Sequence, residues 1–97
     1  MEDTAFLPLE IPKETVTTLR FPQEDVLFDE DEKEARKRDL MRALSLGNLE
    51  HQKILTYFED DAGLKCVNTT FRAVTEKQVV LKYGNTIPIQ RIRKIIF

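Results

Sequence analysis

The sequence predicts a mainly β fold with one α-helix: a small five-stranded antiparallel barrel preceded by an N-terminal helix and an extended leader. Three observations support this prediction. Residues 65–97 consist of short apolar runs separated by turns, residues 29–46 carry a helical pattern, and three of the four prolines come before residue 29. A chain of 97 residues favours one small domain, which we assign to residues 29–97.

We expect residues 1–28 to form a leader arm, because proline fixes its own φ and pushes the preceding residue toward extended geometry. The leader is also rich in apolar side chains, which disordered segments usually lack. It therefore either wraps over the domain and adds a strand to a sheet edge, or docks on another chain, including a second copy of itself. Residues 15–19 (TVTTL) are its best strand candidate, since β-branched residues suit a pleated surface.

Residues 29–46 (DEDEKEARKRDLMRALSL) predict the helix. Either Asp29 or Asp31 can cap its start, each with a glutamate three residues later, and Gly47 is a natural residue to end it. The apolar side chains concentrate in its C-terminal half, so we expect that half to pack on the barrel while the first turns face solvent. These side chains are Ala35, Leu40, Met41, Ala43, Leu44 and Leu46.

Five strands are expected in the rest of the chain. They are residues 50–59, 65–74, 79–83, 86–89 and 94–97. Alternation places Phe71 inward and Arg72 outward in the second strand, and places Tyr83 on the same face as Val79 and Leu81 in the third. Gly84–Asn85 predicts a tight hairpin turn. Pro88 cannot donate to a ladder, so the fourth strand should lie at an edge or bend there.

The predicted order of elements, with a one-turn helix at residues 90–93 before the last strand, resembles small SH3-like barrels of the Sm type. The stretch TTFRAVTEKQVVLKYGNTIPIQRIRKI resembles the Rho-binding antiterminator group. It is also similar to small bacterial proteins with the pattern TT-AVTEK-VVLK-G-IPI-RI. The resemblance covers the chain from Leu49 onward. It implies an Sm-like barrel and a bacterial regulatory protein that binds a transcription-termination helicase.

The formal net charge of −2 is unevenly distributed. Residues 1–48 hold seven basic and twelve acidic side chains, whereas residues 49–97 hold eight basic and five acidic ones. The basic second half permits an anionic partner. Five basic residues there have no predicted structural role and are candidate contacts for a partner or for nucleic acid: Arg72, Lys82, Arg91, Arg93 and Lys94. Tyr83 or Phe97 could supply a stacking surface beside them.

Residue patterns for catalysis were sought and none is convincing. His51 and Cys66 could pair as base and nucleophile, but no third orienting group is evident. Asp60 and Asp61 lack the spacing of a calcium loop, and the three glycines are too scattered to cradle a phosphate. We therefore predict no enzyme activity, no cofactor, no metal and no small-molecule substrate. The single cysteine and the lack of a long apolar run predict a cytoplasmic location without membrane insertion.

Two functions follow from these observations. The preferred one is a protein-interaction or regulatory module, linked to transcription, that recruits a partner or associates with itself through the leader and the open strand edges. The alternative is an RNA-binding or single-strand-binding protein that uses the basic face of the barrel. The two differ in their response to salt, because phosphate binding weakens steeply as salt rises.

Overall fold

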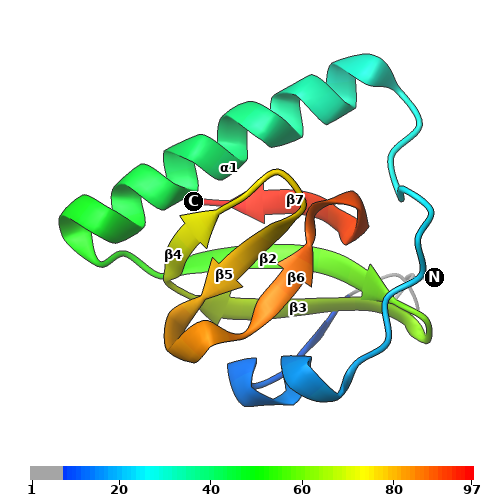
Figure 1. Ribbon diagram of the computed structural model, residues 1–97, viewed down its shortest axis with the longest axis horizontal. Coiled ribbons are helices and arrows are strands. Elements are labelled where there is room, and N and C mark those ends of the chain that lie inside the picture. The colour runs from blue at the N-terminus through cyan, green and yellow to red at the C-terminus, as the bar shows by residue number, and fades with distance from the viewer. Residues whose placement is uncertain (1–7) are drawn as a thin grey trace, which may run out of the picture.

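The computed structural model describes residues 8–97, and it has one main helix and two sheets (Figure 1). The four-stranded sheet has the order β1-β3-β2-β7 and the three-stranded sheet the order β4-β5-β6. The helix is α1 (Glu30–Glu50); the strands are β1 (Leu9–Glu10), β2 (Ile54–Asp60), β3 (Gly63–Thr69), β4 (Phe71–Val74), β5 (Gln78–Leu81), β6 (Thr86–Pro88) and β7 (Ile92–Ile96). Three short 3₁₀ helices are η2 (Lys13–Thr18), η3 (Lys82–Gly84) and η4 (Ile89–Arg91).

The β-rich fold with one main helix agrees with the sequence prediction, but the sheets do not close into a five-stranded barrel. The predicted long strand at residues 65–74 is interrupted at Thr70, which belongs to neither sheet. Its carbonyl accepts a hydrogen bond from the Lys82 N–H (3.1 Å) in place of a ladder partner. The chain therefore passes from one sheet to the other at Thr70, and β3 and β4 become separate strands.

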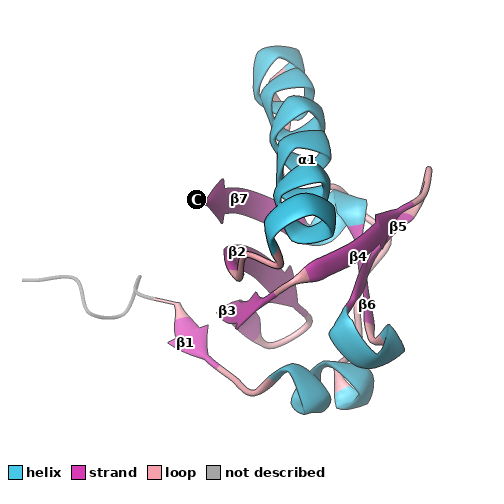
Figure 2. Ribbon diagram, turned by 90° about the vertical axis from the view of Figure 1, so that its left-hand side faces the viewer, coloured by secondary structure: helices cyan, strands magenta, loops and turns pink. Residues whose placement is uncertain are grey.

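The core lies between the two sheets and under α1, which crosses one side of them (Figures 1 and 2). Phe58 of β2 and Phe71 of β4 are fully buried, so Phe71 points inward as predicted. Phe21, from the segment before α1, packs on Phe58 with ring centroids 5.9 Å apart. The other buried members are Val16, Leu40, Ala43, Ile54, Val67, Val79, Leu81, Ile87, Ile92 and Ile95.

The start of α1 follows the first of the two predicted caps. The Asp29 carboxylate accepts a hydrogen bond from the Asp31 N–H at 2.8 Å. The expectation that the first turns face solvent is wrong at Arg36, which is buried. Its guanidinium donates to the carboxylate of Asp25 and to the carbonyl of Ile92, so the second turn of the helix is anchored by a charged side chain.

The end of α1 differs from the prediction, because the helix continues through Gly47 to Glu50. His51 caps it in the left-handed conformation, with φ 55°. A Cβ built on Gly47 would lie 2.6 Å from the Phe71 carbonyl oxygen and 3.1 Å from Thr70 Cγ2. Glycine is therefore required at this position by the close approach of the helix to β4. Because the helix is longer than predicted, the strand expected at residues 50–59 begins only at Ile54.

The described part of the leader lies against its own chain. β1 pairs in parallel with β3, and the Ile11 N–H donates to the Cys66 carbonyl at 2.9 Å. The predicted strand at residues 15–19 is wrong: this segment forms η2, which places Val16 in the core. The first seven residues of the leader, which include the apolar Phe6 and Leu7, lie outside the described residues.

The connection from β5 to β6 is also shifted from its predicted place. It spans η3, where Tyr83 and Gly84 both have positive φ, of 72° and 88°. Tyr83 was expected to share a strand face with Val79 and Leu81, but these two are buried and the side chain of Tyr83 is exposed. The reason is that β5 ends at Leu81, two residues earlier than predicted. Tyr83 therefore belongs to the turn, and the alternation of strand faces does not determine where its side chain lies. Pro88 ends β6, which is an edge strand as predicted.

Candidate functional site

The five basic residues that the sequence singled out do not share one surface. Arg72 and Lys82 line one pocket at the C-terminal end of α1. Arg93 and Lys94 line another, between α1 and β7, where Glu32 and Asp39 contribute acidic groups. Arg91 belongs to neither lining.

The prediction that Arg91 is free to contact a partner is corrected by its burial. Its Nε donates to the Glu59 carbonyl at 2.9 Å, and its Nη1 donates to the Glu24 carbonyl at 2.7 Å. Arg93 is also engaged, through a 2.7 Å ion pair with the Glu59 carboxylate. Arg91 therefore attaches the segment before α1 to β2, and has a structural role that the sequence did not reveal.

The pocket that contains Arg72 and Lys82 is basic, and we refer to it as the basic pocket. It has a volume of about 340 Å³ and lies at the C-terminal end of α1, the end of the helix that is nearer the viewer in Figure 2. Its lining consists of Gly47, Asn48, His51, Lys53, Thr70, Arg72 and Lys82. Among residues 8–97, no acidic side chain belongs to this lining.

Three permanent cations converge on the basic pocket: Lys53, Arg72 and Lys82. Within residues 8–97 none of them forms a salt bridge or a side-chain hydrogen bond with another residue. The carbonyl end of α1 contributes the equivalent of about half a negative charge. Three positive side chains exceed this partial charge, so the lining as a whole is positive.

Thr70 brings the basic residues together, because three segments meet at it. Its hydroxyl lies 3.5 Å from the His51 carbonyl at the end of α1, and its carbonyl accepts the Lys82 N–H after β5. Arg72 follows two residues later, at a register shift between β4 and β5, and its side chain is exposed. Lys53 comes from the short link between α1 and β2. These segments are distant in sequence, so sequence reasoning found Arg72 and Lys82 but not Lys53 or His51.

Tyr83 adjoins the basic pocket through its neighbour Lys82. The side chain of Tyr83 is 75% exposed, and the Lys82 ammonium lies 5.5 Å from the centroid of its ring. On the leader side, the Lys13 ammonium lies 5.2 Å from the same centroid. The Asn85 side chain fixes that part of the leader by donating to the Lys13 carbonyl at 2.6 Å. The exposed ring of Tyr83 thus lies between Lys82, which lines the basic pocket, and Lys13 of the leader, which sequence reasoning did not single out.

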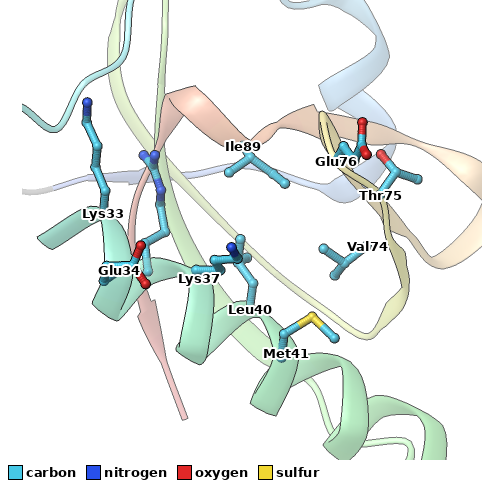
Figure 3. A pocket seen from close by; sticks show the side chains of 10 residues that line it. Lys33, Glu34, Lys37, Leu40, Met41, Val74, Thr75, Glu76 and Ile89 are labelled. Carbon is cyan, nitrogen blue, oxygen red and sulfur yellow. The ribbon is translucent and has the colours of Figure 1, made fainter. Parts of the chain in front are cut away.

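A second concave surface lies between α1 and the connection from β4 to β5, with a volume of about 520 Å³ (Figure 3). Leu40, Val74 and Ile89 line it, and Met41 beside them is 54% exposed. We call it the helix groove. Its polar lining carries both signs of charge: Lys33, Glu34, Arg36, Lys37 and Glu76, with the neutral Thr75. The helix groove therefore offers an apolar contact but no dominant charge.

His51 and Cys66 are not arranged as a catalytic pair. The strand register places Cys66 opposite Tyr57, whereas His51 lies next to Thr70, beyond the other end of β3. Cys66 is buried, and burial together with the charge of Glu10 raises the pKa of its thiol. This favours the thiol over the nucleophilic thiolate.

The carboxylate of Asp60 is engaged by its own chain. Oδ1 accepts from the Ala62 and Gly63 N–H groups, and both oxygens accept from the Lys65 ammonium at 2.9 Å. Asp60 therefore organises the turn between β2 and β3. Within residues 8–97, no three side chains of the metal-binding types gather at one place.

Fold and site together define a small β-rich protein with one long helix, a basic pocket at the end of that helix, and an exposed tyrosine beside it. Comparison with known proteins found no matching family model, no matching curated protein and no matching solved structure. Among the described residues, no helix combines the length and the apolar character needed to cross a membrane.

Proposed function

We propose that the protein is a non-enzymatic binding module that binds a phosphate-bearing partner at the basic pocket. The observation that supports this is the convergence of Lys53, Arg72 and Lys82 without an acidic neighbour in the lining. Arginine offers a planar fork of donors that matches phosphate oxygens, and lysine adds a mobile point charge. An ion pair between exposed groups contributes only about 0.2–1 kcal/mol, so the three cations must act together to hold a polyanion.

The test is equilibrium binding of inorganic polyphosphate and of a labelled single-stranded oligonucleotide, measured at low and at high salt. We expect binding that weakens as salt rises, because phosphate contacts release counterions. Replacing Arg72 and Lys82 by glutamine should weaken binding about tenfold or more. The matched control replaces Arg38 and Lys77 by glutamine, which removes one arginine and one lysine from exposed positions outside the pocket. The proposal fails if neither polyanion binds at low salt, or if the control loses as much affinity.

A second candidate is the protein interaction that the sequence favoured, and the helix groove supports it. β4 is an edge strand, and edge strands accept an extended segment of another chain. The exposed Met41 beside Leu40 and Val74 would give that segment an apolar contact. Because the sequence resembles the antiterminator group, the partner to test is a transcription-termination helicase.

The experiment for this candidate uses the purified helicase. Met41→Asp should abolish binding while Arg72→Gln leaves it intact, because only Met41 lies in the helix groove. The reverse pattern would assign the helicase to the basic pocket. Binding that neither variant affects would remove the helix groove as a docking site.

We also propose that the protein is related to the Sm-type SH3-like barrels, in an open form. The order of helix, strands and the one-turn η4 supports this assignment. The single cysteine, which is unpaired, supports a cytoplasmic location. A crystal structure would test the first assignment by comparison of strand order, and fractionation of the source cells would test the second.

A further inference from the structure

We infer that the ligand of the basic pocket is a single-stranded nucleic acid, with one of its bases stacked on Tyr83. This inference rests on the proposed function and narrows it, because a phosphate site alone would also accept a phosphopeptide, a polyphosphate or a duplex. The added evidence is the backbone, the exposure and the neighbours of Tyr83.

The backbone of Tyr83 is in an unusual state for a bulky residue. It has φ 72° and ψ 13°, in the left-handed region where a side chain is strained. Asparagine or glycine suits such a turn position better. The ring gains no burial in return, because 75% of the side chain is exposed. Folding alone therefore does not explain a tyrosine here, and such strained residues often occur at binding sites.

The surroundings of Tyr83 suit a nucleotide. A base can stack on the ring, as bases do on aromatic side chains in single-strand-binding proteins. Lys82 and Lys13, whose ammonium groups lie 5.5 and 5.2 Å from the ring centroid, can reach the phosphates on either side of that base. These contacts approach the outer limit of about 6 Å for a cation–π interaction, so a stacking base can displace the flexible lysines.

Lys82 links this ring to the rest of the site. It lines the basic pocket with Lys53 and Arg72, and it also contacts Tyr83. A strand whose base lies on Tyr83 can therefore place its next phosphates in the pocket. The Lys13 ammonium lies 3.9 Å from the Glu14 carboxylate, but this glutamate is largely exposed and the pair is weak.

Two comparisons favour a single strand over other phosphate carriers. The bases of a duplex are stacked on one another and their faces are closed to a side chain, whereas the bases of a single strand can be splayed onto an aromatic ring. A phosphopeptide supplies charge but need not supply a flat π-face.

Phe97, the other stacking candidate from the sequence, is 41% exposed and already carries the Arg42 guanidinium 4.3 Å from its ring centroid.

The test uses the full chain and three probes: a single-stranded oligonucleotide, an abasic sugar-phosphate oligomer of the same length, and inorganic polyphosphate. A duplex of the same sequence serves as a competitor. The variants are Tyr83→Asn, which removes the ring while suiting the left-handed backbone, and Tyr83→Phe, which keeps the ring. We expect Tyr83→Asn to weaken oligonucleotide binding about tenfold and to leave polyphosphate binding unchanged. Tyr83→Phe should bind like the unaltered chain, and the abasic oligomer should bind more weakly than the intact one.

The possible outcomes distinguish a failure of base stacking from a failure of the proposed phosphate site. If the abasic oligomer binds as tightly as the intact one, or Tyr83→Asn binds the intact oligonucleotide as tightly as the unaltered chain does, base stacking is refuted while the phosphate site stands. If no probe binds at low salt, the proposed function itself fails. If duplex competes as well as single strand, the single-strand assignment is overturned. A thermal melt of Tyr83→Asn at or above that of the unaltered chain excludes unfolding as the cause of lost binding.

Discussion

Arg36 and Asp25 form a two-point ion pair, with Nη1 to Oδ1 at 3.0 Å and Nη2 to Oδ2 at 2.8 Å. The Arg36 side chain is only 7% exposed, and its Nη1 also donates to the Ile92 carbonyl at 3.0 Å. The guanidinium therefore joins α1, the segment before it, and the start of β7.

Replacing Asp25 by alanine should lower the free energy of unfolding by about 3 kcal/mol, because it leaves the buried charge of Arg36 without its counter-charge. Arg36→Met should also be destabilising, since the Asp25 carboxylate and the Ile92 carbonyl then lose their donor. The double variant should cost less than the sum of the two single variants. Urea unfolding of all four proteins gives this cycle, and strict additivity would show that the pair does not couple.

Two carboxylates make stability depend on acid pH. Burial alone raises the pKa of Asp25, but the hydrogen bonds from Arg36 and Leu27 and the Arg36 charge together hold that pKa below 3.8. Burial likewise raises the pKa of Asp60, but hydrogen bonds from Lys65, Ala62 and Gly63 hold it below the same value. In both cases the unfolded chain binds a proton more readily than the folded chain does.

The stability from these two groups is therefore fully present above the unfolded pKa of about 3.9, and is lost as pH falls through the folded pKa values. Urea unfolding at pH values from neutral down to acid should show a decline that begins near the unfolded pKa. Asp60→Asn should be less stable at neutral pH and should decline less on acidification. An equally steep decline in that variant would assign the acid sensitivity to other carboxylates.

Gly47→Ala should destabilise the protein by about 1–3 kcal/mol, although alanine ordinarily stabilises a helix relative to glycine. The reason is the 2.6 Å approach of the added Cβ to the Phe71 carbonyl oxygen, a backbone atom that cannot move aside alone. The matched control is Ser45→Ala on the exposed side of α1, which should be neutral or slightly stabilising. A melting temperature that rises for both variants would contradict the close packing of helix and strand.

Thr56→Val should raise the free energy of unfolding by about 1 kcal/mol. The Thr56 hydroxyl is fully buried in β2 and has no hydrogen-bond partner within the described structure. Valine has nearly the same shape and removes this cost of burying a polar group. Thr69→Val, at another buried threonine without this defect, serves as the comparison. A loss of stability in Thr56→Val would mean that its hydroxyl is bonded after all.

The sequence predicted the helix, its Asp29 cap and the inward position of Phe71 because each depends on neighbours along the chain. It did not predict the end of the helix, since Gly47 was interpreted by its own backbone preference, whereas its role comes from Phe71 on another element. The interruption at Thr70 was missed for a similar reason: residues 65–74 have strand character throughout, and the break depends on packing.

The candidate site was predictable only in part. Arg72 and Lys82 lie on segments whose outward positions follow from local pattern, and both do line the basic pocket. Arg91 has a similar local sequence pattern, yet it is buried and its guanidinium donates to the carbonyls of Glu59 and Glu24. Which of several similar arginines stays free is decided by contacts between distant segments, and one sequence does not contain that information.

The placement of the leader has a consequence for how the chain assembles on the ribosome. The Lys13 carbonyl is held by Asn85, 72 residues later, and the Glu24 carbonyl by Arg91, 67 residues later. At a synthesis rate of about 5–20 residues per second, the leader waits on the order of ten seconds for these partners. During that interval Val16 and Phe21 have no core to enter, and chaperones and proteases can reach them. A nascent chain that stops before Asn85 can form the pairing of β1 with β3 but lacks both of these later contacts to the leader.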